Sequence, residues 1–162
     1  MMRPALLAAL IAILPACSSD PNPDATSASR SSTPQAIAAV PDAGLPPQRL
    51  APGKCGLFLW GMSAPRQFVL FAESPAASAL VLMNGKAVTL PMTAAGGEVF
   101  GQFVTDMKFE DAASRTQVQV TLKPGEVLEG GQRVDTGNIL FRDEQGWETI
   151  LPVTGVRACM PG

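Results

Sequence analysis

The sequence predicts an all-β domain, a small antiparallel β-barrel or sandwich of about eight or nine strands. Glycine and proline number 15 each in 162 residues, which is too frequent for long helices. Short apolar runs follow one another at a spacing of roughly ten residues, with turn residues between them. An Asn-Gly pair at residues 84–85, flanked by two apolar runs, is a strong hairpin signal because both residue types tolerate a positive φ.

The first 16 residues combine a basic residue with an apolar run. Arg3 precedes the ten apolar residues 5–14, which are too few for a membrane-spanning helix of about 20 residues and are typical of a cleaved signal peptide. The next residues, Leu14-Pro15-Ala16-Cys17, resemble the bacterial lipobox, in which the cysteine is acylated and becomes the mature N-terminus. The resemblance implies that residues 1–16 are removed and that acyl chains of the palmitate type on Cys17 anchor the protein in a membrane.

The residue after the lipobox cysteine carries information on localisation. Gram-negative lipoproteins with Asp at this position stay at the inner membrane, whereas this chain has Ser18. By the same resemblance we expect the protein on the periplasmic face of the outer membrane.

Residues 17–52 are predicted to be the lipidated cysteine followed by a disordered linker. Residues 18–52 contain seven prolines, six serines and seven alanines, and their large apolar side chains are only Ile37, Val40, Leu45 and Leu50. Such a segment buries too little apolar surface to offset the entropy lost on ordering. We therefore expect one β domain, residues 53–162, held clear of the membrane by this linker.

The strands of the β domain are predicted from short apolar or alternating runs. They are residues 57–60, 67–72, 79–83, 86–92, 99–104, 116–123, 139–142, 147–151 and 153–158. The alternation in 116–123 places Val118, Val120 and Leu122 inward. Turns are expected at residues 96–97, 124–125, 130–131 and 143–146, and one helical turn is expected within residues 106–114.

The cysteines suggest a disulfide. With Cys17 assigned to lipid, Cys55 and Cys159 remain near the two ends of the β domain, in a compartment where disulfides persist. A bridge between them would close a loop of about 100 residues and stabilise the fold by roughly 4–5 kcal/mol in the chain-entropy model. Two free buried thiols are the alternative.

Composition argues against several classes of function. The chain has no histidine, which removes histidine bases, Ser-His-Asp and Cys-His catalysis, and histidine metal ligands. A net charge of −2 provides no basic excess for nucleic-acid binding. Ser63 has no base to activate it, and the paired acidic residues fall in predicted turns, where carboxylates are normally solvated. We predict no enzymatic activity, no cofactor and no metal.

Two aromatic residues are candidates for partner binding. Phe58 and Trp60 are two residues apart and share one face of a strand. If that face is exposed, the pair is suited to docking a peptide, a sugar or an acyl chain. If it is buried, the pair fills the core, and the sequence leaves both alternatives open.

Residues 79–103 resemble the membrane-bound C-type lysozyme inhibitors. The stretch VLMNGKAVTLP at residues 81–91 is similar to a strand of that family, and TAAGGE at residues 93–98 corresponds to its small-residue loop. The resemblance implies an eight-stranded barrel, a terminal disulfide and a loop that enters the lysozyme cleft. Where the family has a serine and a basic residue in this loop, this chain has Ala95 and Glu98, so Glu98 and the nearby Lys86 join the candidate partner-binding residues.

These observations predict a non-enzymatic, membrane-anchored periplasmic lipoprotein. Its barrel would act as a binding or scaffolding module for another envelope protein, without nucleic acid. Two alternatives are an inhibitor of a cell-wall hydrolase and a carrier of a small apolar ligand inside the barrel.

Overall fold

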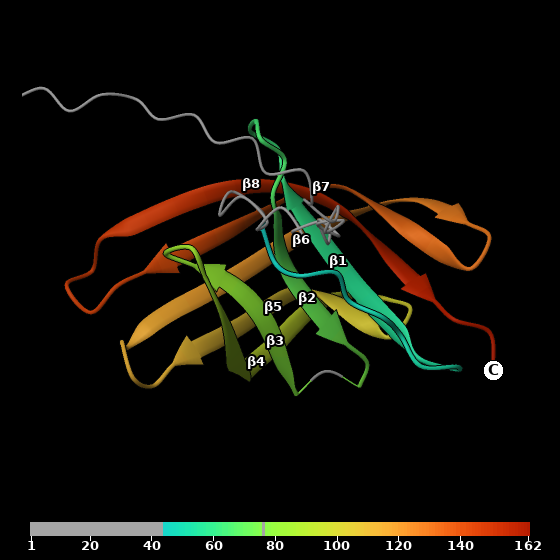
Figure 1. The fold of residues 1–162 in the computed structure, drawn as a ribbon, viewed down its shortest axis with the longest axis horizontal. Coiled ribbons are helices and arrows are strands. Elements are labelled where there is room, and N and C mark those ends of the chain that lie inside the picture. The colour runs from blue at the N-terminus through green and yellow to red at the C-terminus, as the bar shows by residue number, and fades with distance from the viewer. Residues whose placement is uncertain (1–43, 76) are drawn as a thin grey trace, which may run out of the picture. The chain divides into compact units, whose positions relative to one another are not determined.

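The computed structural model describes residues 44–75 and 77–162. The predicted signal peptide, the predicted lipidation site Cys17 and the predicted linker as far as residue 43 lie outside the described residues. The described chain forms a closed antiparallel barrel in which every strand pairs with its sequence neighbours and the first strand pairs with the last (Figure 1). The strands are β1 (Cys55–Gly61), β2 (Phe68–Glu73), β3 (Ser78–Met83), β4 (Lys86–Phe100), β5 (Phe103–Asp111), β6 (Thr116–Leu128), β7 (Gly131–Arg142) and β8 (Glu148–Cys159). The predicted all-β barrel is confirmed.

Alternation along the strands fills the barrel interior with apolar side chains. Val118, Val120 and Leu122 of β6 are buried, as their spacing predicts. Leu57 and Leu59 of β1 are buried in the same core. The interior of an eight-stranded barrel is just wide enough to be filled by such side chains. Their burial therefore stabilises the closed form of the sheet.

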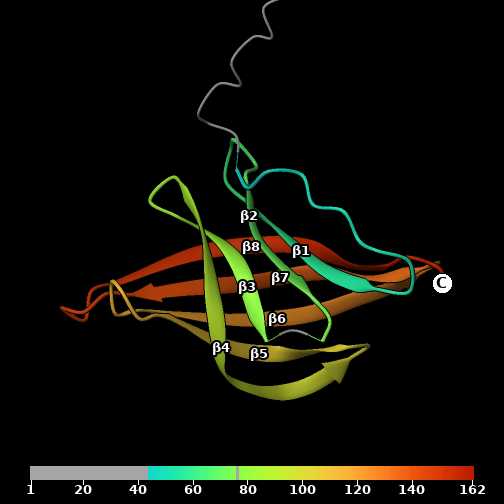
Figure 2. The same ribbon diagram turned by 60° about the horizontal axis from the view of Figure 1, so that its bottom comes forward.

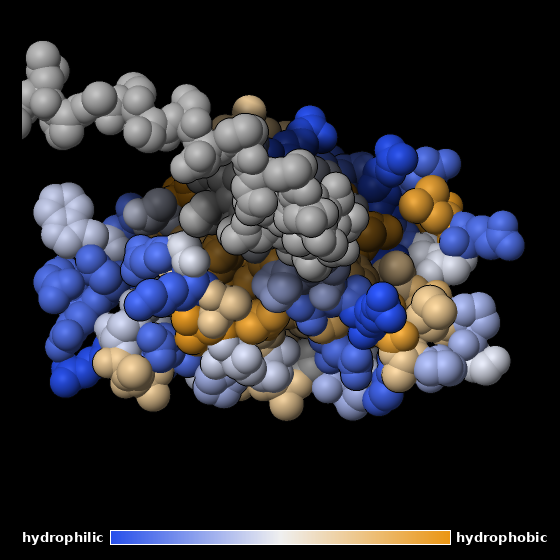
Figure 3. All heavy atoms as spheres, in the orientation of Figure 1, coloured by the Kyte–Doolittle hydropathy of each residue, from blue (hydrophilic) through white to orange (hydrophobic). Residues whose placement is uncertain are grey.

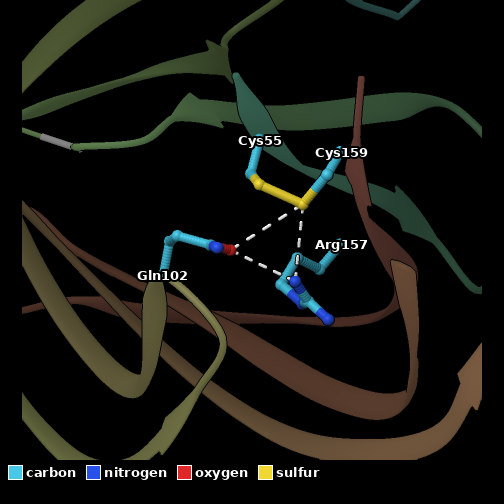
Figure 4. Close-up of a disulfide and its surroundings, with 4 residues drawn as sticks. All are labelled: Cys55, Gln102, Arg157 and Cys159. Atoms are coloured by element: carbon cyan, nitrogen blue, oxygen red, sulfur yellow. Dashed lines mark hydrogen bonds between the residues drawn. A yellow bond between two sulfur atoms is a disulfide. The ribbon is translucent and has the colours of Figure 1, made fainter. Parts of the chain in front are cut away.

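A disulfide joins the first strand to the last. Cys55 and Cys159 pair in the β1–β8 register and are bonded, which confirms the predicted bridge. Arg157 and Gln102 point toward it (Figure 4). Nη1 of Arg157 donates to Oε1 of Gln102 at 3.1 Å and to Sγ of Cys159 at 3.5 Å. The bridge and these two side chains lie at the end of the barrel where β8 finishes.

The opposite end of the barrel is formed by the β1–β2, β3–β4, β5–β6 and β7–β8 connections, and we call it the mouth. The β3–β4 turn is the predicted Asn84-Gly85 hairpin, with φ angles of 50° and 73°. The β7–β8 turn follows Asp143, whose carbonyl oxygen accepts a hydrogen bond from the Gly146 amide at 3.0 Å. Both predicted turns are therefore confirmed.

Two predicted elements are wrong. Phe100 and Phe103 were assigned to one strand, 99–104, but they end β4 and begin β5 and pair with each other across a two-residue turn. Both are buried, because residues that face each other across a hairpin point to the same side of the sheet. One helical turn was expected within residues 106–114, but residues 106–111 continue β5 and residues 112–115 form the turn to β6.

Three strands run through residues that were expected to end or interrupt them. β4 continues past Gly96-Gly97 and β6 past Pro124-Gly125, in both cases with a shift of register. Such bulges accommodate glycine and proline without ending the ladder. β8 similarly unites the predicted strands 147–151 and 153–158.

Candidate functional site: an aromatic groove outside the barrel

Aromatic rings cover the outer face of β1 and β2. Because Leu57 and Leu59 face the core, the alternating residues Phe58 and Trp60 face outward. On β2, Phe68 is paired with Trp60 and Phe71 with Phe58. The ring centroids of Trp60 and Phe68 are 5.2 Å apart, those of Phe58 and Phe71 are 5.0 Å apart, and those of Phe58 and Phe68 are 6.0 Å apart. The four rings therefore form one continuous cluster, which we call the outer aromatic cluster.

A β-bulge allows Phe68 and Phe71 to lie on the same face although they are three residues apart. The β1–β2 register shifts between Leu59 and Trp60, which leaves Val69 as an extra residue on β2. An extra residue reverses the alternation on one side of the bulge. Without this bulge one of the two phenylalanines would point into the core.

The segment before the first strand packs against this cluster. We call residues 44–50 the strap; Figures 1 and 2 show it running along the outside of the barrel beside β1. The Leu45 amide donates to the Phe68 carbonyl oxygen at 2.6 Å, and the Leu45 side chain is only 5% exposed. At Gly44, a Cβ atom would lie 2.3 Å from the same carbonyl oxygen, so only glycine permits this approach. The predicted linker included this segment, whereas the structure places it in contact with the barrel.

Leu50 provides a second contact between the strap and the barrel. It lies over Gly56, the outward-facing residue of β1 that precedes Phe58 by two positions. A Cβ atom at Gly56 would come within 2.8 Å of Leu50 Cδ2 and within 2.8 Å of the Phe58 ring. The absence of a side chain at Gly56 thus makes room for Leu50 beside the aromatic cluster.

A groove of about 500 Å³ remains between the strap and the strands. It is lined by Leu45, Pro47, Gln48, Phe58, Trp60, Phe68, Val156 and Ala158. Seven of these eight side chains are apolar, and Gln48 is the polar one. In the view of Figure 3 hydrophilic side chains gather at the left end of the barrel, and hydrophobic ones are visible near its middle. The groove is suited to an apolar, extended ligand.

The four predicted partner-binding residues do not form one site. Phe58 and Trp60 meet in the groove. Lys86 and Glu98 are both exposed residues of β4, which pairs with β3 and β5 and not with β1. Residues 93–98, expected to be a loop by the lysozyme-inhibitor resemblance, belong to β4, and the Glu98 amide donates to Oγ1 of Thr105 on β5 at 2.9 Å.

The strap and the two β2 phenylalanines were missed as site residues. Phe68 and Phe71 were only weakly indicated, because residues three positions apart lie on opposite faces of a regular strand. Leu45 and Leu50 carried almost none, because two leucines in a proline-rich segment have no periodicity. Their partners come from residues 56–71 and are visible only in three dimensions.

The groove offers apolar contacts and one neutral polar side chain, that of Gln48. Among the residues that line it, none is titratable. Within residues 44–75 and 77–162, no three histidine, cysteine, aspartate or glutamate side chains gather as metal ligands. No helix in that part of the chain is long and apolar enough to cross a bilayer.

Comparisons of this chain with protein-family models, with curated proteins and with solved structures found no match.

Proposed function

We propose that this chain is a lipid-anchored envelope protein and that its barrel is a non-enzymatic binding module. Acylation at Cys17 would hold it on the periplasmic face of the outer membrane. The outer aromatic cluster would take an extended, proline-containing segment of another envelope protein in place of the strap. Aromatic-lined grooves recognise such segments because a proline-rich chain is already extended and loses little entropy on binding.

One observation carries this proposal: the barrel already holds a proline-containing segment of its own chain at this place. Leu45-Pro46-Pro47 lies in the strap, with its leucine buried and its backbone hydrogen-bonded to Phe68. Pro47 lines the remaining groove together with Trp60 and Phe58. The strap therefore provides an example in cis of the ligand that we expect in trans.

The experiment titrates a synthetic peptide of residues 44–50, GLPPQRL, against the full chain in detergent. The intact strap competes at the effective concentration of a tethered ligand, which is of millimolar order. Gly44→Ala forces a Cβ atom against the Phe68 backbone and should release the strap without changing the barrel. We expect the peptide to bind the Gly44→Ala variant at least roughly tenfold more tightly than the wild type.

The matched control is Gly96→Ala, because a Cβ atom at Gly96 meets nothing within 4 Å. This variant should bind the peptide as the wild type does. Adding Trp60→Ala to Gly44→Ala should abolish binding, because the peptide loses its main aromatic contact. Equal affinity of the wild type and Gly44→Ala, or binding that survives Trp60→Ala, would contradict the proposal.

A further inference from the structure

A second cavity lies at the mouth of the barrel, separate from the groove. It has a volume of about 360 Å³, within the range of small-ligand sites. Its lining comes from the ends of β3, β6, β7 and β8 and the turns that join them, namely Leu82, Met83, Asn84, Thr116, Phe141, Asp143, Trp147 and Thr149. Barrel mouths are favoured places for ligand sites because the side chains that fill the interior end there.

Trp147 stands at the rim of this cavity and is 78% exposed. Its amide donates to Oδ1 of Asp143 at 2.8 Å, and its carbonyl oxygen accepts from the Asp143 amide at 3.1 Å. Beside the turn, the guanidinium of Arg142 is paired with the carboxylate of Glu148. These hydrogen bonds fix the backbone of the turn and leave the large aromatic side chain of Trp147 exposed to water. Exposure of such an apolar surface is unfavourable, and a ligand that covers it would gain free energy.

Below the rim, the cavity has an apolar floor, and its polar lining consists of Asn84, Thr116, Thr149 and the carboxylate of Asp143. Met83 and Phe141 are partly buried and pack against the core. Asn84 and Thr149 make no side-chain hydrogen bond to another of the described residues, whereas the Thr116 hydroxyl is hydrogen-bonded to the Ser114 hydroxyl at 2.8 Å. No lysine or arginine lines the cavity, so an anionic ligand would find no counter-charge there.

We propose that the mouth binds a neutral pyranose sugar that carries an N-acetyl group. The sugar ring has an apolar face that stacks on Trp147, while its hydroxyl groups exchange hydrogen bonds with Asn84, Thr149 and Asp143. The acetamido methyl group then contacts Met83 and Phe141. This site is independent of the outer groove, because the two cavities share no lining residue.

The test uses N,N′-diacetylchitobiose and the full chain in detergent. Because the chain has two tryptophans, the Trp60→Phe variant reports on Trp147 alone. We expect a saturable change of its fluorescence on titration. By calorimetry, Trp147→Ala should abolish binding, and Thr149→Val should weaken it roughly tenfold through the lost hydrogen bonds.

The matched control is Ile150→Ala, which removes a side chain that is 63% exposed on β8 and does not line the cavity. This variant should bind the disaccharide as the wild type does. No saturable response at millimolar disaccharide would overturn the proposal, as would binding that survives Trp147→Ala. Equal affinity for cellobiose would refute the N-acetyl requirement, and displacement by tetramethylammonium would identify a site for organic cations instead.

Discussion

The indole of Trp60 stacks on the ring of Phe68 on the outside of the barrel, with centroids 5.2 Å apart and planes 28° apart. The carbonyl oxygen of the same Phe68 accepts the amide hydrogen of Leu45 at 2.6 Å. One residue of β2 therefore contributes its ring to the aromatic cluster and its backbone to the strap. This relationship places a proline-rich segment on an aromatic surface and is the basis of the proposed binding function.

Removal of the disulfide should lower stability without changing the fold. Cys55 and Cys159 are separated by 104 positions, and their bond restricts the unfolded chain. The double variant Cys55→Ala/Cys159→Ala should lose up to about 4–5 kcal/mol in the free energy of unfolding, measured by denaturant titration. Its circular dichroism should stay that of a β-sheet protein, because the β1–β8 ladder pairs from Cys55 to Gly61. An unchanged midpoint of unfolding would show that the bridge does not constrain the chain as described.

The hairpin at the mouth should depend on a left-handed residue. Gly85 has φ 73°, and a Cβ atom there meets nothing within 4 Å, so Gly85→Ala adds only backbone strain. We expect this variant to lose about 1–2 kcal/mol of stability. Gly96→Ala, which also enters open space but has no positive φ, should stay within about 0.5 kcal/mol of the wild type. Thermal unfolding of the two variants compares them directly, and equal losses would refute the role of φ.

Acid should affect the β5–β6 turn through Asp111. The Ser114 hydroxyl donates to Oδ2 of Asp111 at 2.5 Å and the Ala113 amide to Oδ1 at 3.1 Å; these bonds hold the pKa of Asp111 below its ordinary value of 3.8. Because the pKa is lower in the folded state, the carboxylate contributes stability above the unfolded-state pKa and loses it as pH falls through the folded-state pKa. Ser114→Ala should raise the pKa toward 3.8, measured by carboxyl-carbon NMR titration. An unmoved titration would exclude the hydroxyl as the principal cause.

The predicted anchor can be tested at Cys17. An alkyne-labelled palmitate fed to the producing bacterium should label the wild type and leave Cys17→Ser unlabelled, and the variant should leave the membrane fraction. Cys159→Ser provides the matched cysteine control and should remain labelled. Equal labelling of wild type and Cys17→Ser would contradict the lipidation that the Leu14–Cys17 pattern implies.

Local patterns predicted much of the barrel. The alternation around Val118 and the Asn84-Gly85 turn were found because each depends on residues adjacent in sequence. The β4–β5 hairpin was missed because its turn is only two residues long, Gly101-Gln102. With apolar residues on both sides of so short a turn, residues 99–104 have the pattern of a single strand. The lengths of β4 and β6 were underestimated because pairing with neighbouring strands overrides the local tendency of glycine and proline to end a strand.

The sequence predicted the two β1 residues of the candidate site, Phe58 and Trp60, but neither the strap nor the two β2 phenylalanines. The two-residue spacing of Phe58 and Trp60 indicated a shared face, but the spacing could not decide between core and surface. That choice depends on Leu57 and Leu59, which take the inward positions. The groove beside the strap and the cavity beside Trp147 are each lined by segments that lie far apart in the sequence. No local sequence pattern therefore predicts them.

Site-specific photocrosslinking from the groove tests the central claim most directly. A benzophenone side chain at Val156 of β8, which lines the groove from the barrel side, would be introduced into the full chain expressed in bacteria. The account predicts a crosslink that maps by mass spectrometry to a proline-containing segment of an envelope protein, that disappears with Trp60→Ala, and that is absent when the label is at Ile150. A crosslink that persists in Trp60→Ala, or one that maps to segments without proline, would contradict the account.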